Sequence, residues 1–183
     1  AQGVGHADHG DLAHVGVLAG QDQAFLGPES GLALPDGEGG VDVHVATQWL
    51  HVDRDQVAPC LGLRPEQVRI HLAGVGGAFG GREDLSMQIH AAMLALHTDR
   101  PVKIVYNREE SFVGHIHRHP ARIWCEHRAT HDGRLVNVHM RILLDGGAYA
   151  SSSTAVASNA ACFAVGPYRV DNALIEATAV YTN

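Results

Sequence analysis

The sequence VRIHLAGVGGAFGGREDLSMQIHAAMLALH occupies residues 68–97 and joins three patterns. Residues 68–72 are rich in apolar and β-branched side chains, which predicts a strand. Residues 74–81 include five glycines, and glycine lets main chain turn sharply or approach a ligand closely. Apolar residues then recur at helical spacing, at Leu85, Ile89, Ala92, Met93 and Leu96. We expect a helix that begins near Asp84, so that its free N–H groups and partial positive charge face the glycine loop. Such a unit suits an anion or an oxygen-rich ligand.

Three named glycine or metal motifs do not fit the chain. The dinucleotide fingerprint needs glycine at positions i, i+2 and i+5, but counting from Gly74 the third position is Phe79. The phosphate-binding P-loop ends in Gly-Lys-Ser/Thr, whereas Gly81 is followed by Arg82 and Glu83. The zinc deaminase signature needs a second cysteine close after Pro59-Cys60, and there is none. The loop therefore belongs to none of these three classes.

The rest of the chain alternates strands, turns and short helices. Turn residues at 35–40 predict a hairpin of 24–34 with 41–46, and His-Asp-Gly-Arg at 131–134 predicts a second hairpin of 123–130 with 135–144. Other expected elements are helices over 51–61 and 155–163, strands over 102–106 and 174–180, an irregular segment over 108–120, and a poorly ordered start followed by a strand within 1–19. Hairpins outnumber parallel crossovers, so we predict an α+β fold: a mixed sheet with β-hairpins and a few helices.

Composition excludes several classes of protein. The 183 residues carry 13 basic and 20 acidic side chains, a net charge of -7, which is not that of a nucleic-acid-binding domain. No apolar run reaches the roughly 18 residues of a membrane helix, and the first 20 residues lack the pattern of a signal peptide. The three separated cysteines, Cys60, Cys125 and Cys162, are typical of reduced thiols in a cytoplasmic protein.

Residues 76–83, GGAFGGRE, closely resemble the GGGFGGKE loop of the xanthine dehydrogenase and aldehyde oxidase family, which lies in the large subunit that binds the molybdenum cofactor. Further segments that resemble this family follow in order: residues 20–29, 46–48, 118–120, 145–149 and 180–183. The resemblance covers residues 20–183 and implies a partial molybdenum-cofactor-binding domain, an internal part of a larger molybdopterin-binding domain. Residues 1–19 resemble no part of the family and form a separate, poorly matched N-terminal segment.

The resemblance implies roles for individual residues. Gln48 corresponds to a glutamine whose amide hydrogen-bonds an oxygen ligand on molybdenum, a donor that does not compete for the metal. Gly77, Phe79 and Gly80 lie in the loop whose backbone reaches the metal ligands and the pterin, and no protein side chain ligates the metal. Glu83 corresponds to a residue that contacts substrate in members that oxidise purines. Read without the resemblance, Gln48 closes a strand, Glu83 favours a helix N-terminus, and Arg82, where the family has lysine, is a surface charge.

The implied activity is that of a molybdenum hydroxylase. Water-derived oxygen is inserted at an electron-poor carbon of a purine or aldehyde, and electrons pass to iron–sulfur clusters and FAD on partner domains or subunits. The pterin is expected in its cytosine dinucleotide form if the protein is bacterial. The family's catalytic base lies outside residues 1–183, so this chain alone should be inactive. The alternative is a self-contained anion-binding module that uses the glycine loop without redox chemistry.

Overall fold

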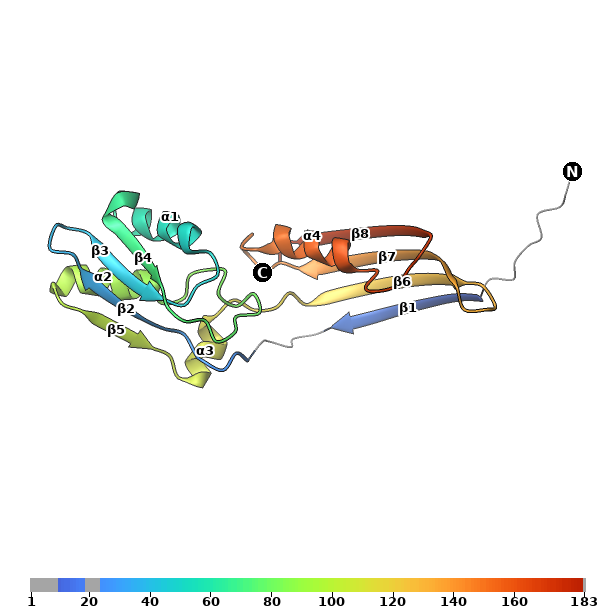
Figure 1. Cartoon of the computed structure of the whole chain (residues 1–183), viewed down its shortest axis with the longest axis horizontal. Coiled ribbons are helices and arrows are strands. Elements are labelled where there is room, and N and C mark those ends of the chain that lie inside the picture. The colour runs from blue at the N-terminus through green and yellow to red at the C-terminus, as the bar shows by residue number, and fades with distance from the viewer. Residues whose placement is uncertain (1–9, 19–23, 183) are drawn as a thin grey trace, which may run out of the picture. The chain divides into compact units, whose positions relative to one another are not determined.

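The computed structural model describes residues 10–18 and 24–182, and the chain divides into two compact units (Figure 1). One unit is continuous and spans residues 22–118. The other combines residues 1–21 with residues 119–183. In the part of the chain that the structure describes, each unit contains one four-stranded sheet, so the expected mixed sheet is in fact two sheets, each with parallel and antiparallel pairs.

The sheet of unit 22–118 has the strand order β4-β3-β2-β5. Its strands are β2 (Ser30–Pro35), β3 (Val41–Val45), β4 (Val68–Leu72) and β5 (Val102–Val105). β2 and β3 form the expected antiparallel hairpin, and β4 joins β3 in parallel. The Asp36 carboxylate stabilises the hairpin turn by accepting bonds from the N–H groups of Glu38 and Gly40, at 2.8 and 2.7 Å. β2 starts at Ser30, later than expected, since the preceding segment contains Pro28, which cannot donate to a sheet ladder.

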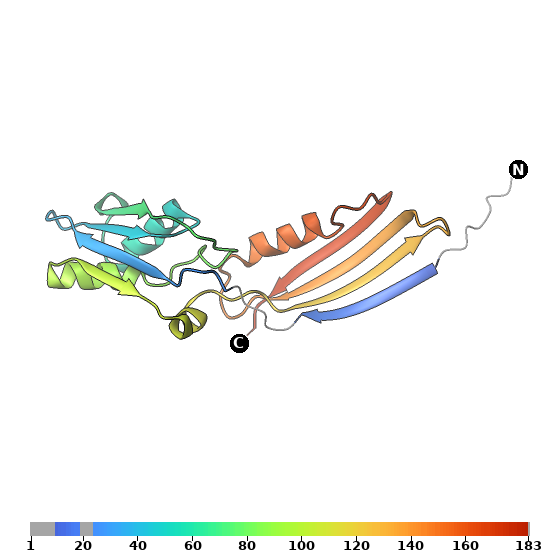
Figure 2. The same cartoon turned by 60° about the horizontal axis from the view of Figure 1, so that its bottom comes forward.

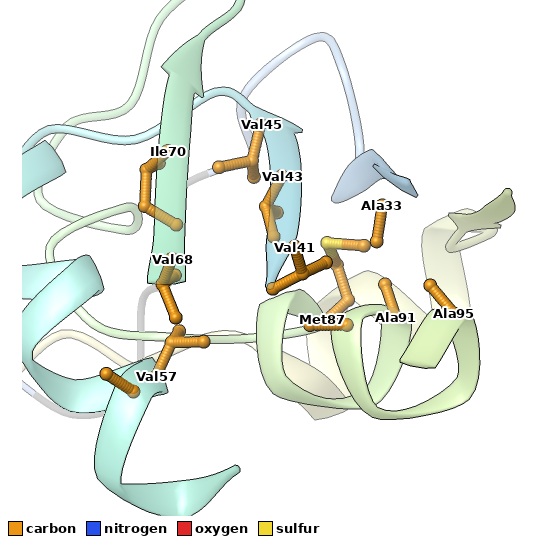
Figure 3. Close-up of a cluster of buried hydrophobic side chains, with 12 residues drawn as sticks. Ala33, Val41, Val43, Val45, Val57, Val68, Ile70, Met87, Ala91 and Ala95 are labelled. Carbon is orange, nitrogen blue, oxygen red and sulfur yellow. The ribbon is translucent and has the colours of Figure 1, made fainter. Parts of the chain in front are cut away.

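Two helices cover one face of this sheet and close its core (Figure 3). They are α1 (Leu50–Cys60) and α2 (Gln88–Thr98). Alternate strand residues point at them because side chains of a strand alternate between its two faces. The short alanines of α2 allow the helix to lie close to the strands. The core consists of Ala33, Val41, Val43, Val45, Val57, Ala58, Val68, Ile70, Met87, Ala91, Ala92 and Ala95.

Two expectations for this unit were wrong. Helix α2 begins at Gln88 and not near Asp84, and the Gln88 side chain occupies its N-terminus by accepting bonds from the N–H groups of Ser86 and Met87 at 2.7 and 2.9 Å. The residues between the loop and α2 form turns and bends instead. The segment expected to be irregular contains α3 (Arg108–Gly114), which Asn107 caps by accepting the N–H of Glu110.

The sheet of the other unit has the strand order β1-β6-β7-β8. Its strands are β1 (Gly10–Leu18), β6 (Ala121–Ala129), β7 (Leu135–Asp145) and β8 (Asn172–Val180). β6 and β7 form the second expected hairpin, whose turn uses Gly133 at φ +87°. β8 pairs with β7 in parallel, and helix α4 (Ser153–Phe163) lies along β8 (Figure 2).

The fold class of the described residues is α+β, as the sequence predicts. None of the helices within residues 10–18 and 24–182 is long and apolar enough to cross a membrane. The site that the sequence indicates lies entirely in unit 22–118, at the end of β3 and in the loop between β4 and α2.

Candidate cofactor site

The glycine loop follows a path that needs glycine at two positions. Gly77 has φ +109° and Gly80 has φ +86°, both in the region that side-chain-bearing residues rarely adopt. A Cβ atom on Gly77 would also lie 3.0 Å from Cε2 of Phe79. Phe79 itself is left-handed, at φ 53°, and its side chain is 70% exposed. The loop therefore holds strained main chain at an accessible surface, a combination that clusters at ligand sites.

Two main-chain donors of this loop are available. The N–H of Gly81 donates to the carbonyl of Ala78 at 2.8 Å, which closes the turn. The N–H groups of Phe79 and Gly80 donate to no acceptor among the described residues. Adjacent unpaired N–H groups on exposed main chain suit the oxygen atoms of an anionic or oxygen-rich ligand. The donor set therefore fits a molybdenum–pterin group.

The Gln48 side chain has a fixed orientation beside the loop. Its Oε1 accepts the main-chain N–H of Arg82 at 3.3 Å, and its own main-chain N–H donates to the carbonyl of Arg82 at 2.8 Å. Because the amide oxygen is engaged, the amide nitrogen is the end that remains available. Nε2 lies 3.5 Å from Oε1 of Glu83, at the outer limit of a hydrogen bond. An exposed amide thus presents a donor, which is the polarity that an oxygen ligand requires.

Buried polar groups support the Gln48 position from below. The Thr47 hydroxyl donates to the carbonyl of Arg82 at 3.4 Å and accepts the N–H of Trp49 at 3.2 Å. Asp53 is buried on α1 and accepts the Gln88 amide at 3.3 Å. Burial raises the pKa of the Asp53 carboxyl, while its bonds to Thr47 and Gln88 oppose the rise. The strand end, α1 and the start of α2 are therefore tied together behind the site.

Arg82 is buried, which corrects its interpretation as a surface charge. Its guanidinium carbon lies 4.6 Å from the centre of the Phe25 ring, and Nη2 donates to the carbonyl of Gly27. Burial lowers the pKa of Arg82, and the negative charge of Glu29 opposes that shift. No spacing signal around Arg82 distinguishes a buried arginine from an exposed one, so the sequence alone could not find it.

The structure brings the residues singled out from the sequence onto one surface. Gln48 contacts Glu83, and a Cβ atom on Gly80 would lie 3.9 Å from Oε1 of Glu83. Phe79 lies against Gly77. Glu83 lies in a bend ahead of α2 and not in the first turn of a helix, so the explanation of Glu83 by a helix dipole was wrong. No group of three or more His, Cys, Asp or Glu side chains in the described ranges is placed to hold a metal ion.

A strained glycine loop with free main-chain donors beside an outward-facing amide defines a domain that binds an oxygen-rich cofactor. The comparisons with known proteins specify the family. The profile of the molybdopterin cofactor-binding domain matches residues 1–183, including the N-terminal segment that the quoted motifs do not reach. The chain belongs to the molybdopterin cofactor-binding domain family.

Relatives in this family are large subunits of molybdenum oxidoreductases. The chain is 46% identical to the nicotinate dehydrogenase large molybdopterin subunit of Eubacterium barkeri over 87% of its own length and 37% of that protein. It is 39% identical to a probable xanthine dehydrogenase of Bacillus subtilis over 91% of its length and 22% of that protein. The chain thus spans about a third of the first relative and less of the second.

Solved structures agree with this assignment. The aldehyde oxidoreductase of Desulfovibrio gigas matches with a TM-score of 0.78 and 25% identity, over 96% of this chain and 19% of that one. Quinoline 2-oxidoreductase from Pseudomonas putida 86 matches with a TM-score of 0.79 at 24% identity, over 94% of this chain and 23% of that one, and shows the same fold.

Proposed function

We propose that this chain forms one wall of the active site of a molybdenum hydroxylase of the xanthine dehydrogenase and aldehyde oxidase type. The observation that carries the proposal is the Gln48 amide, whose oxygen is engaged by Arg82 and whose nitrogen is presented beside the loop. When bound, the molybdenum–pterin group supplies the redox chemistry that adds water-derived oxygen to an electron-poor carbon.

The residues of this chain orient that group. Gln48 donates from Nε2 to one of its oxygen atoms, and the N–H groups of Phe79 and Gly80 donate to others. Gly77 and Gly80 allow the main chain to approach because neither places a Cβ atom in the way. Hydrogen bonds of this kind, made to the ligands of a metal and not to the metal, tune and orient the centre.

Glu83 is proposed to select the substrate. Its carboxyl lies next to the Gln48 amide and is only partly buried, so a planar ring above the loop can reach it. A carboxyl at this place can hydrogen-bond a ring nitrogen and stabilise charge that develops there during attack. A purine therefore fits this site better than a simple aldehyde. The names of two relatives, a nicotinate and a probable xanthine dehydrogenase, also indicate nitrogen heterocycles.

The remaining parts of the enzyme are proposed from the family. They are the rest of the large subunit, and iron–sulfur and FAD domains or subunits that take the electrons. The cofactor is proposed in its cytosine dinucleotide form, and the assembled enzyme in the cytoplasm. Because the chain covers a minor part of its relatives, the isolated 183 residues are proposed to have no turnover of their own.

Replacement of Gln48 in the assembled enzyme tests the proposal. Gln48→Ala should lower kcat/KM by about 10- to 100-fold, the usual loss when a partner of a metal ligand is removed. The matched control is Gln56→Ala, an exposed glutamine on α1 that should change neither turnover nor molybdenum content. Equal activity of the two variants would remove Gln48 from the site.

A second replacement tests the choice of substrate. Glu83→Gln should lower the turnover of a purine by about 100-fold or more, in the range seen when a group that assists proton transfer is lost. Turnover of an aromatic aldehyde should change much less, because an aldehyde has no ring nitrogen for the carboxyl. The exposed Glu66→Gln serves as control. A parallel loss on both substrates would contradict the selective role of Glu83.

A further inference from the structure

Arg82 connects three segments that are far apart in the sequence. Its main-chain N–H and carbonyl bond Gln48, and the carbonyl also accepts the Thr47 hydroxyl. Its main chain directly follows the glycine loop. Its side chain reaches the segment before β2, where it donates to the carbonyl of Gly27 and covers the ring of Phe25. The part of the chain that positions the Gln48 amide is therefore anchored through one guanidinium.

A buried opposite charge holds that guanidinium in place. Glu29 is 2% exposed, and neither of its carboxylate oxygens has a hydrogen-bond partner within the described residues. The Arg82 Nε atom is likewise buried without an acceptor there. The two groups attract each other, as the effect of Glu29 on the pKa of Arg82 shows. Removing either member would leave an uncompensated charge in the interior, which is strongly unfavourable.

The segment to which Arg82 is anchored is itself held from a second direction. Nη2 of Arg108, in α3, donates to the carbonyl of Phe25 at 2.8 Å and to that of Leu26 at 3.1 Å. Two arginines from different elements thus bind consecutive carbonyls of the same short segment. The anchor of Arg82 is consequently fixed within unit 22–118 and does not depend on an exposed loop.

We infer that Arg82 is a positioning residue that orients the Gln48 amide through its buried contact with Glu29. The inference rests on the proposed function, because it gives the Gln48 amide a purpose. When the guanidinium is lost, the N–H of Arg82 shifts away from Oε1 of Gln48. The amide is then free to turn, and it presents its oxygen or its nitrogen to the ligand without preference. A side chain that touches neither substrate nor cofactor thereby controls a donor that does.

Hydrogen–deuterium exchange in the assembled enzyme tests the structural half of the inference. Arg82→Met should speed amide exchange about tenfold in peptides covering residues 44–50 and 77–83, because their mutual bonds open more often. Exchange in α2 should stay unchanged. The matched control is Arg54→Met, an exposed arginine on α1. No change at 77–83, or an equal rise throughout α2, would overturn the inference. Should Arg82→Met not fold, Arg82→Lys and Glu29→Gln, judged by the same criteria, replace it.

A double-mutant cycle tests the functional half. Arg82→Met should lower kcat by about tenfold in the parent enzyme and by less than about twofold in the Gln48→Ala background, because residues that act as one unit are not additive. Equal losses in both backgrounds would overturn the positioning role, while the proposed function would stand. If Gln48→Ala itself has no effect on turnover, the proposed function fails, and the inference fails with it. Arg82→Lys should restore part of the loss.

Discussion

The two units of the chain differ in how completely their sheets are covered. In unit 22–118, two helices bury a cluster of valine, alanine and methionine side chains against one sheet face. In the other unit, α4 covers a cluster whose fully buried members are only Ala121, Ile142 and Leu144 among the described residues. An open groove of about 700 Å³ lies between α4 and β8, and Phe163 is 75% exposed.

The difference shows where positional precision is available. The loop and the Gln48 amide lie in the unit whose core is closed, so strained main chain rests on side chains that cannot rearrange cheaply. Strained conformations persist only where the surroundings over-determine them. The chain has one tryptophan in each unit, Trp49 and Trp124, so variants with a single tryptophan report on the two units separately.

The largest expected effect is in the closed core. Met87→Ala should lower the free energy of unfolding of unit 22–118 by about 3 kcal/mol, since Met87 is fully buried. Ile142→Ala in the other unit should cost about 2 kcal/mol, because its surroundings are looser and can relax. Denaturant unfolding, followed by Trp49 or Trp124 fluorescence, measures each. Equal costs, or a loss from Met87→Ala seen at Trp124, would contradict the difference in packing.

The next effect is backbone strain in the loop. Gly77→Ala should cost about 2 kcal/mol, because alanine disfavours φ +109° and its Cβ would crowd the Phe79 ring. Bound molybdenum in the assembled enzyme should fall with it. Gly74→Ala is the matched control, since its φ is not in the left-handed region and nothing lies within 4 Å of a Cβ there. If the two variants are equally stable and equally loaded, the loop does not need glycine at 77.

Helix caps distinguish the units on a smaller scale. Asn107 caps α3 with its side chain, so Asn107→Ala should cost about 1 kcal/mol at Trp49. Ser152 stands at the N-cap of α4 but makes no side-chain capping bond, so Ser152→Ala should change stability by less than about 0.5 kcal/mol at Trp124. Thermal unfolding of both variants measures the pair, and a larger cost for Ser152→Ala would reverse the expectation.

The smallest effect concerns acid. The Arg69 guanidinium, bonded to Asp42 at 2.7 Å, holds the pKa of that carboxyl well below its usual value of 3.8, burial opposes the shift, and His71 adds to it. Because the folded pKa lies below the unfolded one, this contribution is complete above about pH 3.8 and is lost as the pH falls below it. Asp42→Asn should therefore reduce the acid sensitivity seen at Trp49 and leave that at Trp124 unchanged. An identical acid titration at both probes would exclude this contribution.

Turn chemistry made both hairpins predictable, because glycine and aspartate at 35–40 and 131–134 allow few other structures. Helix boundaries were harder. The apolar period starts at Leu85, but Ser86 and Met87 bond the Gln88 side chain, so the helix starts later. Helix α3 has seven residues and no apolar period, and only the spacing of Asn107 and Glu110 indicated its start.

The candidate site was predictable where it depends on local sequence. The loop and Gln48 could be singled out from their motifs. The burial of Arg82 could not, because it arises when the fold brings the segment at 25–29 beside the loop, and one sequence carries no signal for that proximity.

The most direct test of the account is a crystal structure of the assembled enzyme that contains this chain, with the metal located by anomalous scattering at the molybdenum edge. The account predicts a cofactor oxygen within hydrogen-bond distance, about 3 Å, of Gln48 Nε2, with the main chain of Phe79 and Gly80 against the same group. A molybdenum position remote from this loop, with the Gln48 amide facing only protein or solvent, would contradict it.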